Sequence, residues 1–218
     1  MIARTQQSRS QILAAVRNAL DQGSPNKRAT SPGKLVVPAC AELDASGRQA
    51  LFIDMAVEAA ATIHQIASAE KIPWAVADYL GERKLTGKGV IAPDMSELPY
   101  GQAGLDIRCG NGKDSDTFSL TGAFAGIAET GALALLSGPG SPTTLNFLPE
   151  AHIVALKADD IVGTYEDVWS RLSALEIAMP RTVNFITGPS RTADIEQTMQ
   201  FGAHGPRHLH ILLIDEHR

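Results

Sequence analysis

The stretch AHIVALKADDIVGTYEDVWSRLSAL, residues 151–175, carries the pattern that decides the fold. Its first seven residues form a short apolar segment, which predicts a β-strand. Its last twelve residues, TYEDVWSRLSAL, predict a helix. A strand followed by a helix is the repeating unit of an α/β protein.

The same alternation of short apolar segments and turns continues on both sides of this stretch. The other predicted strands are GVIAP (89–93), GLDIRC (104–109), GALALLSG (131–138), RTVNFITG (181–188) and LHILLID (209–215). RTADIEQTMQ, residues 191–200, predicts a second helix in this region. Strands separated by helices favour an α/β sheet with parallel pairs.

The N-terminal part of the chain has a different sequence pattern, with predicted helices and a linker in place of short strands. Ser10–Leu20 has apolar residues at helical spacing, and the Ser, Pro, Gly and Lys-rich residues 21–34 predict a mobile linker. The alanine-rich run Gly47–Ser68 is the longest predicted helix, and KIPWAVADYL, residues 71–80, predicts another. We therefore expect an N-terminal helix and mobile linker over residues 1–46 and one main domain over residues 47–218.

Composition excludes several classes of protein. The net charge of −5 and the absence of a long Lys/Arg cluster argue against a nucleic-acid partner. No apolar run approaches the length of a membrane span or of a signal-peptide core, which predicts a cytoplasmic protein. Cys40 and Cys109 lie far apart in the sequence and cannot supply four thiolates, so we expect two reduced structural thiols and no iron–sulfur or structural zinc site in this chain.

The first chemical candidate is NFITGPSRTADIEQ, residues 184–197. It predicts a strand, a Gly188-Pro189 turn, and a helix that begins at Ser190 or Thr192. The N-terminus of such a helix has unpaired N–H groups that suit an anion. The lysine and glycine spacing of nucleotide-binding loops are absent. The alternative is a plain strand-to-helix turn, and Arg191 favours the anion site.

Two further candidates stand where predicted strands begin. Glu129 and Thr130 precede Gly131 and a strongly apolar strand, so the carboxylate is a nucleophile, a general base, a helix cap or a member of a surface ion pair. His152 opens the strand of residues 151–157. Its imidazole either donates to a site or satisfies a loop carbonyl.

The final candidate is GAHGPRHLHILLID, residues 202–215. His204 lies in a glycine-rich turn, and His208 and His210 share one face of the last predicted strand. No carboxylate in the turn completes a set of metal ligands, so no metal site is predicted.

Taken in order, three motifs resemble those of the lactate utilization protein C family, also called the LUD domain. They are GIAETGALALL (126–136), LPEAHIVAL (148–156) and ITGPSRTADIEQTMQFGAHGPRHLHILLID (186–215). The resemblance implies a fold similar to the NagB/RpiA/CoA-transferase group, with a mostly parallel sheet flanked by helices and an N-terminal helical appendage. It also implies a non-redox subunit that works in the oxidation of L-lactate to pyruvate. Its partners would be iron–sulfur subunits, and this chain would hold no cofactor of its own.

The resemblance also marks individual positions, although the roles given to them below are our own expectations. The family pattern marks Glu129, Thr130, Gly131, Pro149, His152, Thr187, Gly188, Pro189, Ser190, Thr192, Asp194, Glu196, Gly202, His204, Gly205 and Pro206. We expect catalytic roles for Glu129 and His204. The expected ligand-binding residues are Thr130, Gly131, His152, Gly188, Ser190, Arg191, Thr192 and Gly205. The expected ligand is a small carboxylate such as lactate or pyruvate.

Two alternatives stay open at this point. Ala128-Glu129-Thr130-Gly131 is similar in outline to the Ser-Glu-Asn-Gly turn of CoA transferases, so the chain is alternatively an autonomous enzyme that uses Glu129, either CoA-transferase-like or sugar-phosphate-isomerase-like. The other alternative is a scaffold or sensor that docks through its N-terminal helix.

Overall fold

The computed structural model describes residues 2–22, 42–86, 88–175, 178–193 and 199–216. The chain divides into two units, Met1–Val37 and Pro38–Arg218. The first unit contains helix α1, Ile2–Gln22, which confirms the predicted N-terminal helix and extends it. From residue 23 onward the predicted mobile linker lies outside the described residues.

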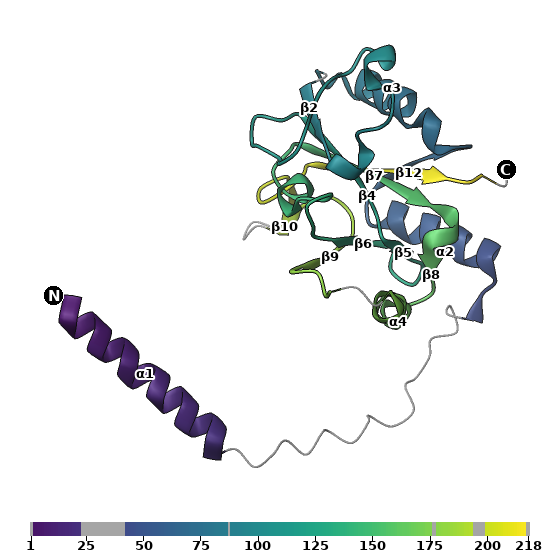
Figure 1. Ribbon diagram of the computed structural model, residues 1–218. Helices are drawn as coiled ribbons and strands as arrows, with labels where there is room; N and C mark the ends of the chain where they lie inside the picture. The colour runs from purple at the N-terminus through teal and green to yellow at the C-terminus, as the bar shows by residue number, and fades with distance from the viewer. Residues whose placement is uncertain (1, 23–41, 87, 176–177, 194–198, 217–218) are drawn as a thin grey trace. The chain divides into compact units, whose positions relative to one another are not determined.

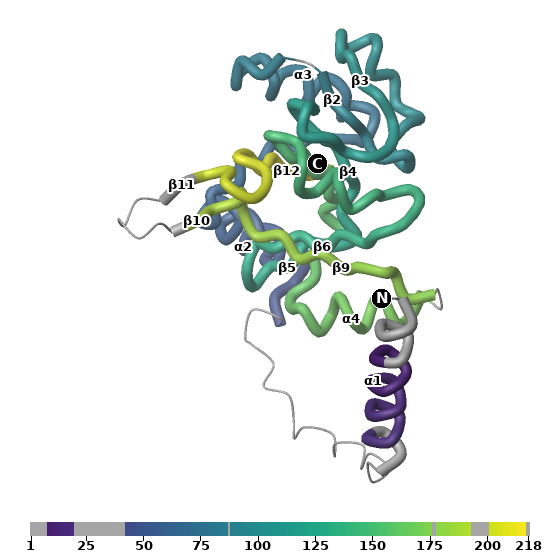
Figure 2. Tube along the Cα trace, turned by 90° about the vertical axis from the view of Figure 1, so that its left-hand side faces the viewer, coloured from purple at the N-terminus to yellow at the C-terminus, as the bar shows by residue number. Residues whose placement is uncertain are grey.

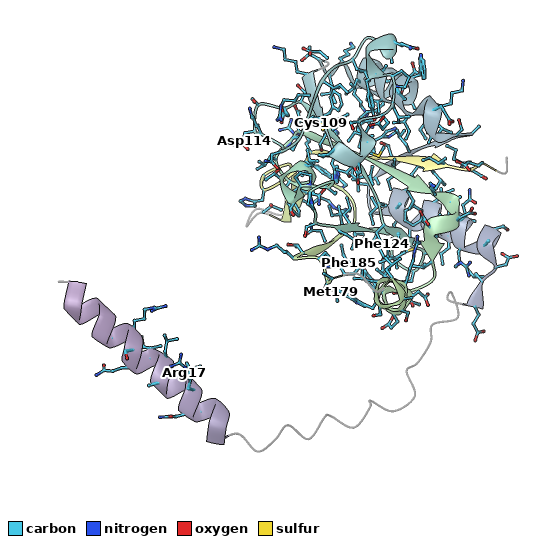
Figure 3. The ribbon with its side chains drawn as sticks, in the orientation of Figure 1. Arg17, Cys109, Asp114, Phe124, Met179 and Phe185 are labelled. Carbon is cyan, nitrogen blue, oxygen red and sulfur yellow. The ribbon has the colours of Figure 1, made fainter. Side chains whose placement is uncertain are left out.

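A six-stranded, wholly parallel sheet forms the centre of the second unit (Figure 1). In spatial order its strands are β1 Thr62–Ile66, β12 His208–Ile214, β7 Ala151–Lys157, β4 Phe118–Gly122, β2 Lys88–Ile91 and β3 Asp106–Cys109. The predicted α/β sheet with parallel pairs is therefore confirmed. Cys109, labelled in Figure 3, is exposed and unbridged on the edge strand β3.

Helices cover both faces of this sheet, as Figure 1 shows. Helix α3, Ile72–Arg83, packs on one face with Ile153 of β7, and helix α2, Ala45–Glu58, packs on the other face with Val154. Because successive side chains of a strand point to opposite faces, a strand buried on both sides is apolar throughout. This explains the continuous apolar character of the segment that begins at Ala151.

A smaller mixed sheet lies on the α2 side of the large sheet. Its strands, in spatial order, are β8 Ile161–Val162, β5 Ala125–Ile127, β6 Ala132–Leu136 and β9 Val183–Ile186. Helix α4, Tyr165–Ala174, covers its far face through Val168. Figure 3 labels Phe124 and Phe185 near α4, and the Phe185 ring meets Tyr165 edge-on at 5.0 Å between centroids.

Short 3₁₀ helices complete the second unit. They are η2 Ala69–Lys71, η3 Pro93–Met95, η4 Tyr100–Ala103, η5 Thr143–Asn146 and η6 Ala158–Asp160. None of the helices within the described ranges combines the length and the apolar character needed to span a membrane.

The predicted helix over Gly47–Ser68 is wrong in its second half. Helix α2 ends at Glu58, and Ala60 adopts a left-handed conformation with φ of 69°. The β-branched residues that follow favour a strand. Thr62–Ile66 accordingly pairs with β12 as strand β1.

The predicted helix over residues 191–200 is also wrong. Arg191–Ala193 forms strand β10, which pairs antiparallel with β11, Met199–Phe201, as Figure 2 shows. The Ser190 N–H donates to the Pro206 carbonyl at 2.9 Å, so this group joins a neighbouring loop instead of heading a helix. Residues 194–198, with the marked Asp194 and Glu196, lie outside the described residues.

Two glycine turns make backbone contact with the second half of α2. Gly131 has φ of 65°, and a Cβ atom there would lie 2.3 Å from the Ala56 nitrogen. Gly188 has φ of 69°, and its Cβ atom would lie 2.0 Å from the Ala59 carbonyl oxygen. Both distances are shorter than any van der Waals contact. These glycines therefore allow α2 to lie directly against the turns after β5 and β9.

We predict that Gly188→Ala destabilises the fold by about 2–4 kcal/mol, from a strained left-handed backbone and a forced shift of α2. Urea unfolding followed by circular dichroism measures the change. Gly81→Ala in α3 is the matched control, since no atom lies within 4 Å of the added methyl group. Alanine also favours a helix by about 0.5–1 kcal/mol, so this control is expected to stabilise the protein. Equal effects from the two substitutions would contradict the packing argument.

Candidate functional site

A cavity of about 260 Å³ lies where the large sheet meets the end of β9. Two of its lining residues, His152 of β7 and Leu209 of β12, lie near the start of central strands of the large sheet. Three loop segments supply most of the remaining lining, namely Asn146-Phe147, Thr187–Ser190 and His204–Pro206. The cavity thus brings together residues from distant parts of the chain.

Backbone hydrogen bonds hold two of these segments against each other. The Ser190 N–H donates to the Pro206 carbonyl and the Gly202 N–H donates to the Ser190 carbonyl, both at 2.9 Å. A Cβ atom on Gly205 would lie 3.2 Å from the Ser190 Cβ atom, so the two turns also touch. The Ser190 and His204 turns therefore form one wall.

His152 is the most deeply buried polar residue of the lining, with no solvent exposure. Its Nε2 lies 2.8 Å from the Thr121 hydroxyl on the neighbouring strand β4, and its buried Nδ1 has no partner among the described residues. Burial lowers the pKa of His152 to about 3. The ring is therefore neutral near pH 7 and offers one free nitrogen.

Asn146 contributes a second buried polar atom to the lining. Its side chain is only 4% exposed, and its Oδ1 has no partner among the described residues. The Ser119 hydroxyl donates to the adjoining Leu145 carbonyl at 2.6 Å and so fixes this segment against β4. Buried polar atoms in proteins are nearly always hydrogen-bonded, so two unpaired ones in one cavity lining favour a polar ligand or ordered water there.

The structure brings together half of the residues predicted for the site. His152, Gly188, Ser190, His204 and Gly205 all line this cavity. The other predicted residues, Glu129, Thr130, Gly131, Arg191 and Thr192, are not among its lining. Sequence reasoning missed Asn146, Phe147 and Phe185. The sequence gives one indication for Asn146: it is a polar residue between Leu145 and two further apolar residues, which suggests that it is buried.

Glu129 and Thr130 instead contact the first turn of α4. The Glu129 carboxylate accepts a hydrogen bond from the Tyr165 N–H at 3.2 Å, and the Thr130 hydroxyl donates to the Tyr165 hydroxyl at 3.1 Å. Of the roles considered for Glu129, helix capping is the one with contacts in the structure. The catalytic role of Glu129 stays a prediction.

Arg191 stands on β10 with an exposed side chain, two positions from Pro189. No helix begins at Ser190 or Thr192, because Arg191–Ala193 is a strand. The predicted binding of an anion at a helix N-terminus is therefore wrong. Cys40 lies outside the described residues. Groups of three or more His, Cys, Asp or Glu side chains placed to hold a metal ion do not occur among the residues that the structure describes.

The sequence and the fold of this chain are similar to those of other proteins. A model of the LUD domain matches residues 39–214. The chain belongs to the LUD domain family. The crystal structure of a DUF162 family protein from Deinococcus radiodurans has the same fold, with a TM-score of 0.59 and 23% identity over 79% of this chain and 99% of that one.

Several relatives of this LUD-domain chain are known by sequence. An uncharacterized protein of Neisseria meningitidis is 42% identical over 95 residues, which cover 44% of this chain and 41% of that protein. Lactate utilization protein C of Exiguobacterium is 32% identical over 100 residues, 44% of each chain. Lactate utilization protein C of Deinococcus radiodurans is 28% identical over 158 residues, 67% of this chain and 70% of that one. The chain thus spans less than half the length of the first two relatives.

The capping contact of Glu129 leads to a stability prediction. Glu129→Ala removes the acceptor of the Tyr165 N–H, and we expect a loss of about 1 kcal/mol in urea unfolding. Glu166→Ala is the matched control, because Glu166 is an exposed carboxylate in the same helical turn. It should cost only a few tenths of a kcal/mol. A larger loss for Glu166→Ala than for Glu129→Ala would contradict the capping role.

The burial of His152 leads to a prediction about pH. Its folded pKa of about 3 lies below the ordinary value of 6.5, so between these values the unfolded chain binds more protons than the folded chain. Stability is therefore expected to fall as the pH drops below 6.5, by up to about 1.4 kcal/mol per pH unit for this group. Burial lowers the pKa of His210 to about 4, which adds a second contribution of the same sign.

Urea unfolding at pH 7.0, 6.0 and 5.0 measures this slope. His152→Gln should flatten it, because one group that titrates on unfolding is gone. His204→Gln removes an exposed imidazole from the turn before β12 and serves as the control that retains the slope. Identical slopes in the wild type and His152→Gln would show that His152 does not contribute.

Proposed function

We propose that this LUD-domain chain acts in the use of lactate by binding a small carboxylate, lactate or pyruvate, in the cavity of His152, Ser190 and His204. The observation that carries the proposal is that two buried polar atoms of this cavity's lining residues, His152 Nδ1 and Asn146 Oδ1, have no partner among the described residues. The names of the relatives support the link to lactate.

The size and polarity of the cavity suit such a ligand. Its volume of about 260 Å³ is below the roughly 300–1,000 Å³ typical of pockets for drug-sized molecules. The Ser190 hydroxyl and the His204 imidazole supply hydrogen-bond donors for a carboxylate. The free His152 nitrogen and the Asn146 oxygen then suit the hydroxyl group of lactate. None of the described lining residues is a lysine or an arginine, so we expect millimolar affinity, about −4 kcal/mol.

The proposed role is that of a non-redox subunit. With only two cysteines, this chain lacks the thiolates of a four-cysteine cluster, so electrons from lactate would pass to iron–sulfur partner subunits. The chain would bind the carboxylate or organise the complex in which lactate is oxidised to pyruvate.

Titration of the full chain with L-lactate, pyruvate and propanoate by NMR or calorimetry tests the binding step. We expect Ser190→Ala and His204→Gln to weaken L-lactate binding by about three- to tenfold, the loss of one hydrogen bond each. Ser173→Ala on α4 and His64→Gln are the matched controls, since both residues lie outside the cavity lining. Propanoate, which lacks the hydroxyl, should bind less tightly than L-lactate. Equal binding of all three ligands by every variant would refute the site.

The cellular role has its own experiment. A strain lacking this chain should grow poorly on L-lactate and should lose lactate-dependent dye reduction, and the wild-type chain should restore both. Normal growth and dye reduction in the deletion strain would refute the link to lactate, whatever the binding data.

A further inference from the structure

A second cavity of about 310 Å³ adjoins the first at the start of β1 and β12. Pro189 and Leu209 line both cavities. The other principal lining residues are Thr62, Tyr79, Arg83, Phe201, Arg207 and His208. They come from β1, α3, β11 and the residues at the start of β12.

Two guanidinium groups from distant segments line this second cavity, and none of the described residues of its lining carries a carboxylate. In the part of the chain that the structure describes, the ion pairs are Arg108–Asp116 and Arg171–Asp160. Neither Arg83 nor Arg207 therefore has an acidic partner among the described residues. In a protein with a net charge of −5, two arginines that line one cavity and form no ion pair with a described residue favour an anionic ligand.

The side chain of Arg207 lies directly over Gly202. A Cβ atom on this glycine, whose φ is 81°, would lie 3.0 Å from the Arg207 Cβ and 3.4 Å from its Nε. The Arg207 N–H donates to the Glu150 carbonyl at 2.8 Å, which anchors the backbone at this position. The missing side chain at residue 202 thus leaves room for the guanidinium group at the cavity.

Arg83 lies beside a stacked pair of aromatic rings. The Arg83 guanidinium lies 5.8 Å from the centre of the Tyr79 ring, whose second partner is the His210 ring at 3.9 Å and nearly parallel. His210 Nδ1 lies 2.8 Å from the Thr62 hydroxyl. The Tyr79 ring already contacts Arg83 and His210, so we do not expect it to stack on a ligand. We expect the two guanidinium groups to recognise the ligand through its negative charge.

We propose that this second cavity binds a small organic oxyanion with two negative charges, through Arg83 and Arg207. Guanidinium groups match the geometry of phosphate and carboxylate oxygens with paired N–H donors. Phe201, Pro189 and Leu209 supply an apolar surface for the carbon part of the ligand. The site is separate from the proposed lactate cavity, which has no arginine among the described residues of its lining, and it does not depend on that proposal.

The charges around His208 agree with this assignment. Burial lowers the pKa of His208, and the positive charges of Arg83 and Arg207 lower it further, whereas the Glu150 carboxylate acts in the opposite direction. Both arginines therefore exert a positive field on the cavity lining. A bound dianion would reduce that field.

Calorimetric titration of the full chain with four probes tests the proposal. The probes are inorganic phosphate, glycerol 3-phosphate, malate and L-lactate, each at constant ionic strength. We expect one of the dianions to bind and Arg83→Gln and Arg207→Gln each to weaken it by about tenfold or more. Tighter binding of glycerol 3-phosphate than malate identifies a phosphate ligand, and the reverse order identifies a dicarboxylate.

Lys84→Gln is the matched control, because it removes the same charge beside Arg83 from an exposed residue outside the cavity lining. It should change dianion binding less than twofold. Circular dichroism and unfolding midpoints check that all variants fold. Binding of none of the dianions by the wild type, or equal losses for Lys84→Gln and Arg83→Gln, would overturn the proposal. Unchanged L-lactate binding in both arginine variants would show that the two cavities act separately.

Discussion

Direct contact of α2 with two glycine turns is the packing constraint on which the other features of the second unit depend. At Gly131 and Gly188 the backbone lies so near Ala56 and Ala59 that no side chain fits between them. One turn carries Glu129 to the start of α4, and the other forms a wall of the cavity at Ser190. The position of a single helix therefore determines both features.

The polar groups at the cavity depend on the same sheet that forms the apolar core. β7 contributes Ile153 and Val154 to opposite faces, yet its second residue, His152, is a fully buried histidine. A buried neutral imidazole with one unpaired nitrogen is costly unless a ligand or water completes its hydrogen bonds. On our proposals, this neutral cavity takes a monocarboxylate, and the adjoining arginine cavity takes a dianion. The two cavities would then select their ligands by charge.

The predictable part of the fold consists of elements with a strong local pattern. The apolar strands and α4 were predicted because their periodicity is a property of contiguous residues. Strand β4 was missed, since Ser119 and Thr121 interrupt its apolar residues. These hydroxyls belong in the sheet because Leu145 and His152 offer them hydrogen-bond partners from distant segments. Strand β1 was missed because the alanine-rich run before it favours a helix, and its pairing with β12 comes from a distant segment.

The sequence by itself determined the α/β class, the family motifs, and the grouping of His152, Ser190 and His204 as site candidates. Only the tertiary structure decided that Glu129 accepts a hydrogen bond from the Tyr165 N–H at the start of α4 and that β10, just after Ser190, pairs antiparallel with β11. The reason is that motifs record which residues a family uses, whereas contacts between them depend on pairing across the chain. The hydrogen bonds of Ser190 with Gly202 and Pro206 are such a pairing, and no local preference at Ser190 encodes it.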